Sequence, residues 1–137
     1  MPTIHLEIII GAPSEQVWDA VRDVDALHTR LVPGFVAATE MLPDTTTPTR
    51  RVTFVNGMVA DEKIVSIDDE RRRLVWSIVG LEHHNGGMQV FDAVNGTRIA
   101  WTADLLPAAL VERFAPMMAT GLAKMKSHFE RATTAAA

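Results

Sequence analysis

The chain contains no cysteine. This absence excludes disulfide bonds, thiolate nucleophiles and thiolate-bound zinc. The chain also has no run of about 18 apolar residues, the length that a membrane-spanning helix requires. Its formal net charge is −4, which provides no general attraction for nucleic acid or for anionic membranes. From these absences we expect neither nucleic-acid binding nor stable insertion in a membrane.

Signals for secretion, cofactors and metals are also missing. Residues 1–10 lack the basic region and the cleavage site of a secretory signal, from which we expect a cytoplasmic protein. There is no glycine-rich phosphate loop, nucleophile elbow or zinc-protease motif, and we expect no cofactor. The adjacent His83 and His84 have acidic residues near them in sequence, but the spacing is not a metal-binding signature, so we expect no metal.

The composition is that of a globular domain. Of 137 residues, 47% are hydrophobic and 22% are charged, which excludes a disordered chain. This length suits one domain, covering residues 1–137, with a single core. The sequence leaves open whether the protein is a monomer or a homodimer.

The longest periodic pattern is helical and covers residues 107–131. At about 100° per residue, its apolar side chains fall in one arc of the helix. The arc contains Leu110, Val111, Phe114, Met117, Met118, Gly121, Leu122, Met125, His128 and Phe129. Three methionines and a glycine stand at its centre, and these residue types are adaptable or small rather than shape-specifying. The apolar face is therefore predicted to roof a cavity as well as a packed core.

Strand patterns fill most of the remaining chain, separated by short turns. The predicted strands cover residues 3–10, 35–42, 50–55, 58–67, 74–80, 88–94 and 97–105. After the first strand we predict two short helices, one capped by Ser14 and ending at about Arg22, the other over residues 25–31. Residues 81–87, with two histidines and two glycines, are predicted to form a loop.

Two Asn-Gly pairs predict hairpins. Asn56-Gly57 and Asn95-Gly96 can each supply the two positive φ values of a type I′ turn. A meander of antiparallel strands with one apolar face needs a covering layer, and only the terminal helix can supply it. The predicted fold class is therefore α+β.

Four segments carry a family resemblance. They are Ala12-Pro13-Ser14-Glu15-Gln16-Val17-Trp18, Glu62-Lys63-Ile64-Val65-Ser66-Ile67-Asp68, Arg73-Leu74-Val75-Trp76-Ser77-Ile78-Val79-Gly80 and Gly96-Thr97-Arg98-Ile99-Ala100-Trp101. The chain resembles the START-like superfamily (SRPBCC), and within it the polyketide cyclase/dehydrase and lipid-transport branch, to which the Bet v 1 allergens and the plant abscisic-acid receptors are related. The resemblance implies a helix-grip fold, in which a curved seven-stranded antiparallel sheet wraps around a long C-terminal helix and an internal pocket.

The plant receptors of this superfamily provide a comparison for two residues. Glu62 falls where those receptors have a pocket glutamate, and His83 falls in the loop that acts there as a latch. The tight turn at Asn56-Gly57 replaces their longer gate, and Pro33-Gly34 stand where they have a lysine. A hormone-receptor mechanism is therefore not expected.

Glu62 is the first candidate catalytic residue. If Met58, Ala60, Glu62 and Ile64 form the inward phase of their strand, the carboxylate enters an apolar pocket. Desolvation would then raise its pKa and suit it to proton transfer or to binding a ligand hydroxyl. The alternative is a surface glutamate that faces an arginine across the hairpin, such as Arg51. The mixed faces of this strand leave both orientations open.

His83 is the second candidate, as a general base with an unperturbed pKa of about 6.5. Its alternative is an exposed loop histidine without a role, since no orienting partner is evident. His128 lies on the apolar arc of the terminal helix, where a core or edge position is more common than catalysis.

The predicted pocket lies between the sheet and the terminal helix. Besides Glu62, its predicted lining is Trp76, Ile78, Met88, Val90, Trp101, Phe114, Met117, Met118, Gly121 and Met125. Apolar walls with one or two polar groups suit a polyketide, a lipid or an isoprenoid-like compound. The resemblance implies cyclisation or dehydration of such a ligand, with Glu62 or His83 moving a proton. The alternatives are a non-catalytic carrier or sensor, and an interaction domain with a filled interior.

Overall fold

A computed structural model describes the backbone of residues 2–136 and the side chains of residues 2–132. The elements are β1 (Thr3–Ile10), α1 (Ser14–Arg22), the π-helical turn η1 (Leu27–Leu31), β2 (Val36–Met41), β3 (Thr49–Phe54), β4 (Val59–Asp68), β5 (Arg73–Ile78), β6 (His83–Ala93), β7 (Gly96–Leu106), the 3-10 turn η2 (Ala108–Leu110) and α2 (Val111–Ala136).

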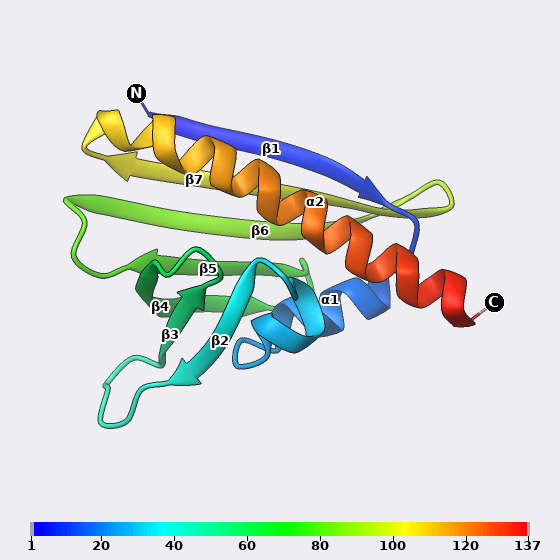
Figure 1. Ribbon diagram of the computed structural model, residues 1–137, viewed down its shortest axis with the longest axis horizontal. Coiled ribbons are helices and arrows are strands. Elements are labelled where there is room, and N and C mark those ends of the chain that lie inside the picture. The colour runs from blue at the N-terminus through cyan, green and yellow to red at the C-terminus, as the bar shows by residue number, and fades with distance from the viewer. Residues whose placement is uncertain (1, 137) are drawn as a thin grey trace.

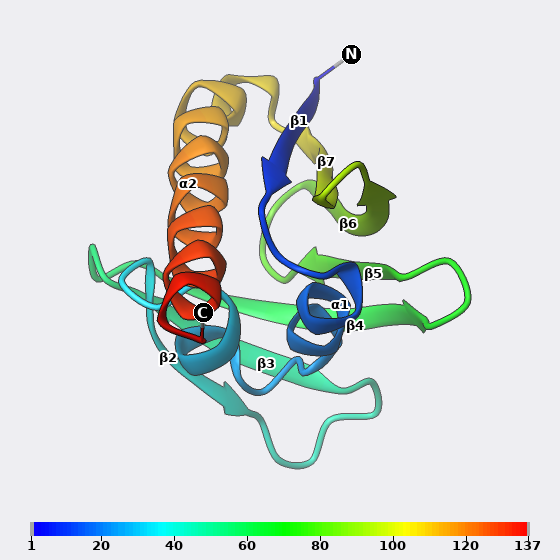
Figure 2. The same cartoon turned by 90° about the vertical axis from the view of Figure 1, so that its right-hand side faces the viewer.

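The seven strands form one antiparallel sheet in the order β1-β7-β6-β5-β4-β3-β2. Strands β2 to β7 follow one another along the chain as a meander, and β1 completes the sheet beside β7. The sheet is strongly curved, and α2 lies along its concave side while α1 lies near one end (Figures 1 and 2). This arrangement confirms the predicted α+β helix-grip fold.

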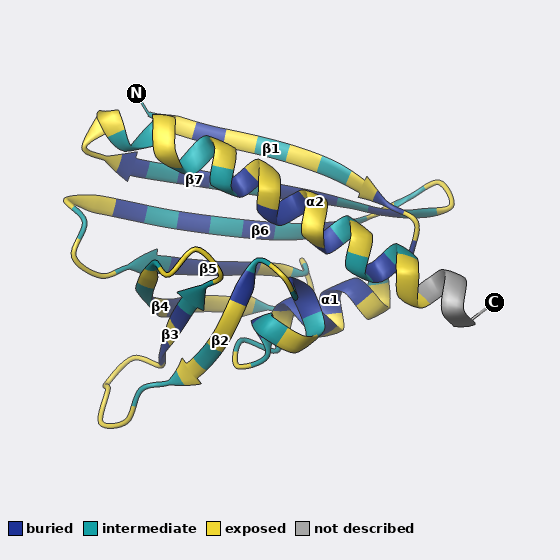
Figure 3. Cartoon of the chain, in the orientation of Figure 1, coloured by how far each residue is buried: buried dark blue, intermediate teal, exposed yellow. Residues whose placement is uncertain are grey.

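Alternation along β1 shows how the sequence selects the inner face. Ile4 and Ile10 are buried and Leu6 and Ile8 are half-buried, whereas the intervening side chains are exposed. Period-two alternation of this kind places one face of a strand on the core. On α2, burial follows the helical period, and dark buried segments recur between exposed ones along the helix in Figure 3.

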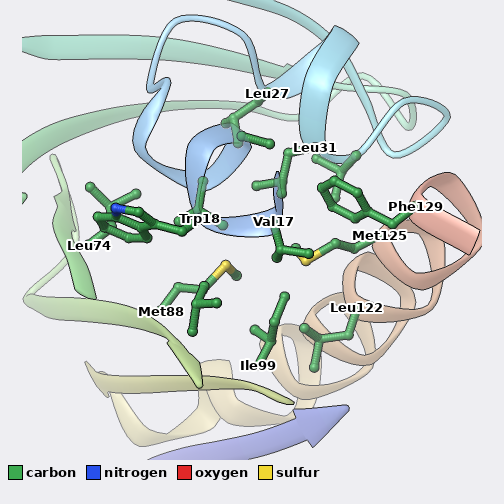
Figure 4. Close-up of a cluster of buried hydrophobic side chains, with 14 of the residues drawn as sticks. Val17, Trp18, Leu27, Leu31, Leu74, Met88, Ile99, Leu122, Met125 and Phe129 are labelled. Atoms are coloured by element: carbon green, nitrogen blue, oxygen red, sulfur yellow. The ribbon is translucent and has the colours of Figure 1, made fainter. Parts of the chain in front are cut away.

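The main core fills the end of the molecule near α1. Side chains of α1, η1, the sheet and the second half of α2 meet there (Figure 4). The labelled members are Val17, Trp18, Leu27, Leu31, Leu74, Met88, Ile99, Leu122, Met125 and Phe129. A smaller cluster of Ile4, Ala103, Leu105 and Met118 lies toward the other end. Members of both clusters line hollow parts of the interior.

The loop predicted over residues 81–87 is wrong in extent. Strand β6 already begins at His83, so only residues 79–82 connect it to β5. Of the two glycines that made this segment resemble a loop, Gly86 has a packing role. A Cβ atom on Gly86 would lie 2.8 Å from the indole of Trp76, so the strand needs glycine at this position.

Both hairpins exist, but their turns are not the predicted ones. In the first, the Gly57 N–H donates to the Phe54 carbonyl (2.9 Å), so Val55 and Asn56 are the central residues, and only Gly57 has a positive φ. In the second, Gly96 pairs with Ala93 across the hairpin, so Gly96 belongs to the strand and is not one of the two central turn residues. A type I′ turn needs positive φ at both central residues, so neither Asn-Gly pair forms one.

Ser14 does not cap α1 as predicted. The N-cap residue is Pro13, and it makes no side-chain capping bond. The Ser14 hydroxyl instead donates to the carboxylate of Asp92 and accepts from Arg72 (2.8 Å). These bonds connect the start of α1 to β6 and to the turn between β4 and β5.

Candidate functional site

Two adjoining cavities lie between the sheet and α2. The first, the inner cavity, has a volume of about 60 Å³, and the second, the outer cavity, about 50 Å³. The inner cavity reaches η1 and the core, and the outer cavity reaches the start of α2. Both are lined by Phe35, Phe54, Glu62, Trp76 and Trp101. The two cavities are therefore parts of one hollow, divided mainly by aromatic side chains.

A groove of about 580 Å³ opens beside the outer cavity. It lies where the β3–β4 turn, the β5–β6 turn and the first turns of α2 come together. Phe54, Ile78, Phe114 and Met117 line both the groove and the outer cavity. These four side chains lie between the outer cavity and the groove.

Glu62 points inward from β4 and lines both cavities. Its carboxylate accepts a hydrogen bond from Arg50 Nε at 2.8 Å, and the two residues are 6% and 2% exposed. The register of the sheet pairs Arg50 directly with Glu62, which brings the two charges together. Of the two orientations that the sequence left open, the structure has the inward one. Arg51 instead pairs with Asp61 at the surface.

Burial raises the pKa of the Glu62 carboxyl, while the charge and hydrogen bond of Arg50 oppose this shift. Arg50 is held by a further bond from Nη1 to the Val24 carbonyl (3.3 Å), and its guanidinium carbon lies 5.7 Å from the centre of a Trp76 ring. Within the described residues, no hydrogen bond reaches Glu62 Oε2 or Arg50 Nη2. Every fully covered side-chain nitrogen or oxygen atom in the described residues has a hydrogen-bond partner. Because these two atoms have none, they are not fully covered, and they are accessible from the hollow that both residues line.

His84 is the buried histidine, and it lines the outer cavity. Its Nδ1 accepts a hydrogen bond from the Ile78 N–H (3.1 Å), and its carbonyl accepts one from the Ser77 hydroxyl (2.7 Å). Because a backbone N–H can only donate, the ring proton must be on Nε2. Burial, aided by the nearby His83, lowers the pKa of His84 to about 4. At neutral pH this ring is uncharged and offers an N–H donor.

His83 lies elsewhere. It is exposed at the start of β6 and lines neither cavity. The residue at the cavity is its neighbour, since successive side chains of a strand point to opposite faces. If the predicted strand had been extended toward the N-terminus with the alternation of Met88 and Val90, His84 would have been placed on the inward face. Arg50 was also missed, although it lies in a predicted strand and points to the same side as Val52.

Most of the predicted apolar lining is present. Trp76, Met88, Trp101 and Met125 line the inner cavity, and Trp76, Ile78, Trp101, Phe114, Met117 and Met118 line the outer one. Two predicted residues line neither. Val90 is buried in the core, and the space beside Gly121 is filled, because a Cβ there would lie 3.1 Å from the Phe35 ring and 3.2 Å from Trp101. Phe35 and Phe54 were not predicted.

His128 is half-buried, packs its ring 5.1 Å from that of Phe129, and lines neither cavity. His128 therefore occupies an edge position on the helix. Nowhere in the described part of the chain do three metal-ligating side chains converge in a possible metal site. No helix in that part has the length and apolar character needed to cross a membrane.

Similar proteins share this architecture. The protein XoxI from Bacillus cereus superposes with a TM-score of 0.81 at 16% identity, over 94% of this chain and 96% of that one. Ara h 8.0201 gives 0.71 at 18% identity over 94% and 97%. Norcoclaurine synthase of Thalictrum flavum, solved with a transition-state analogue, gives 0.63 at 21% identity over 94% of both chains. At these identities the likeness shows the fold alone.

Sequence comparison is more specific. No curated protein matches the chain. A family profile described as polyketide cyclase / dehydrase and lipid transport matches residues 1–131, nearly the whole sequence. The chain therefore belongs to the polyketide cyclase/dehydrase and lipid-transport family.

Proposed function

We propose that this protein binds a hydrophobic small molecule, of polyketide, lipid or isoprenoid type, in the hollow between the sheet and α2. The supporting observation is the composition of the cavity walls. Apart from Arg50, Glu62 and His84, every residue that lines the two cavities is apolar. Apolar walls with a few converging polar groups are typical of small-molecule sites.

The size of the hollow adds a condition to this proposal. Each cavity is much smaller than the roughly 300–1,000 Å³ of pockets for drug-sized ligands. Phe35, Phe54 and Trp101 line both cavities and are half-buried, and Phe54 also lines the groove. Binding of a larger ligand therefore requires these rings to move and join the cavities.

The test is a ligand screen followed by tryptophan fluorescence. Native mass spectrometry of the purified protein looks for a co-purified mass, and a thermal-shift screen covers fatty alcohols, sterols, flavonoids and aromatic polyketides. A ligand at about 100 times its Kd stabilises the fold by roughly 2.7 kcal/mol. Because Trp76 and Trp101 line both cavities, binding there should change their emission. No co-purified mass and no thermal shift would contradict the proposal.

Two matched variants test whether the ligand binds in the outer cavity. Ala103 is 1% exposed and lines the outer cavity, whereas Ala123 is exposed on α2. Ala103→Leu should fill the outer cavity and weaken binding at least about tenfold, a loss of roughly 1.4 kcal/mol. Ala123→Leu adds the same group outside the hollow and should leave the affinity unchanged. Equal affinities of the two variants would place the ligand elsewhere.

Catalysis is a second candidate function, favoured because Glu62 and His84 line the same cavity. In the proposed cyclisation, Glu62 takes a proton from a carbon beside a ligand carbonyl, and the His84 Nε2–H hydrogen-bonds the enolate oxygen. The enolate carbon then attacks a second carbonyl of the same chain, forming a carbon–carbon bond, and Glu62 returns the proton to the new alkoxide. The solved complex of norcoclaurine synthase supports only the general point that this fold accommodates an enzyme.

Two substitutions test this mechanism once a ligand is known. Glu62→Gln removes the base, and His84→Asn removes the Nε2 donor while keeping an acceptor for the Ile78 N–H. Both should lower kcat by about 100-fold or more while the ligand still binds. Full turnover in both variants would show that neither Glu62 nor His84 is a catalytic residue.

A further inference from the structure

The charged residues in the cavity wall constrain the charge of the ligand. Arg50 and Glu62 form a pair without net charge, and their Nη2 and Oε2 atoms remain accessible from the hollow. The pair thus presents one donor and one acceptor side by side. His84 adds a second donor in the outer cavity but no charge, because its pKa of about 4 keeps it neutral at pH 7.

An ionised carboxylate is poorly matched to this wall. The positive charge of Arg50 is already compensated by Glu62 at 2.8 Å, so a carboxylate would add an unbalanced negative charge in an apolar interior. Among the described residues, no lysine and no other arginine lines either cavity. The anion would therefore lose its hydration without gaining a counter-charge.

A neutral hydroxyl group is well matched. It can donate to Glu62 Oε2 and accept from Arg50 Nη2 at the same time. Such bonds to ionised partners are stronger than those between neutral groups. The rest of the ligand then lies against the aromatic and aliphatic walls.

We propose, building on the proposed function, that the site selects neutral amphiphiles carrying an alcohol, phenol or enol group, held by Arg50 and Glu62, and rejects ionised carboxylates such as fatty-acid anions. The preference comes from the zero net charge of the buried pair. Either charged residue alone would select a different class of ligand.

The experiment compares three probes with one ring system: 2-naphthol, 2-naphthamide and 2-naphthoate. Their Kd values are measured at pH 7.5 by tryptophan fluorescence and checked by calorimetry. Naphthol and naphthamide are neutral and should bind at least about tenfold more tightly than naphthoate. Naphthoate binding as tightly as the neutral probes would overturn the inference and leave the proposed function intact. Failure of all three probes and of the broader screen would instead contradict the proposed function.

Glu62→Gln provides a sharper test. It keeps the shape and a hydrogen-bonding group beside Arg50 but removes the negative charge, so the wall becomes cationic. The preference should then reverse in favour of naphthoate. Glu7→Gln is the matched control, because Glu7 pairs with Arg98 on the outer face of the sheet and lines neither cavity. An unchanged preference in Glu62→Gln would contradict the role of the pair, and the three wild-type measurements stand if that variant does not fold.

Discussion

Gly86 leaves room for the indole ring of Trp76 on the cavity side of β6. An added Cβ would lie 2.8 and 3.0 Å from two indole carbons and 3.1 Å from His84 Cε1. These separations are shorter than ordinary van der Waals contacts, so both rings would have to shift. Its neighbour Gly87 has no atom nearer than 3.8 Å to such a Cβ. The two adjacent glycines therefore have different structural roles.

Replacing each glycine by alanine should separate these roles. Gly86→Ala should lower the free energy of unfolding by about 1–3 kcal/mol, because it overpacks the wall formed by Trp76 and His84. It should also shift the tryptophan emission. Gly87→Ala should be within about 0.5 kcal/mol of the wild type. Urea denaturation followed by fluorescence measures both effects, and equal stabilities of the two variants would contradict the packing argument.

His84 makes stability depend on pH. Its folded-state pKa of about 4 lies below the ordinary value of 6.5. Well above pH 6.5 the ring is neutral in both states, so it contributes no pH dependence there. As the pH falls from 6.5 to 4, the unfolded chain takes up a proton that the folded protein does not, and the free energy of unfolding decreases. Below about pH 4 both states are protonated and the loss is complete.

We expect this loss to be about 2 kcal/mol in the wild type, allowing for partial solvation of the ring. His84→Asn keeps an acceptor for the Ile78 N–H but has no group that titrates in this range. The difference between the two stability curves, measured by urea denaturation from pH 7.5 to 4, removes the contribution of the carboxylates. Parallel curves would show that the folded-state pKa of His84 is not lowered.

At the scale of elements, the sequence predicted the strands and helices from their periodicity. Alternation in β1 and the helical arc of α2 are properties of the chain itself, so both elements were predicted, and β1 was predicted to its ends. The helix was predicted over residues 107–131, whereas α2 covers Val111–Ala136 after the 3-10 turn η2. The turns were predicted less well, because an Asn-Gly pair does not determine which residues occupy the central positions. That choice depends on the register between strands and on what the strands pack against. Gly96 illustrates this dependence.

Gly96 begins β7 at the point where β1 ends. A Cβ on Gly96 would lie 2.3 Å from the Ile10 carbonyl oxygen, a backbone atom that cannot rotate away. Gly96→Ala should therefore force the ends of β1 and β7 apart and cost about 3 kcal/mol or more of stability. Gly11→Ala is the control, since the nearest atom to its Cβ is the flexible end of Glu130 at 3.4 Å. Thermal unfolding and amide exchange in β1 measure the effect; full protection of β1 in Gly96→Ala would contradict it.

At the scale of the whole molecule, the sequence predicted the fold and the position of the hollow but not its central ion pair. The apolar faces and the family motifs already placed a cavity between the sheet and the terminal helix. The partner of Glu62, in contrast, depends on the register of β3 against β4, and the sequence alone allowed Arg51 as readily as Arg50. The division of the hollow by Phe35 and Trp101 likewise depends on tertiary packing around Gly121.

The buried pair also predicts a pH-dependent response to mutation. Arg50→Met removes the counter-charge and leaves Glu62 in an apolar interior, which should cost about 3–5 kcal/mol at pH 8. Burial already raises the pKa of Glu62, and without Arg50 its folded-state pKa should rise further. An acid with a raised folded-state pKa loses stability as the pH increases through that value, so the variant should recover part of its stability at pH 5.

A double variant distinguishes a lost pair from lost packing. Combining Arg50→Met with Glu62→Leu removes both charges and replaces them with apolar groups, so the double variant should be more stable than Arg50→Met alone at pH 8. It should also lose the pH response that the single variant gains. If the two costs simply add and neither variant responds to pH, Arg50 and Glu62 act independently, and the charge selectivity of the hollow has no basis in their pairing.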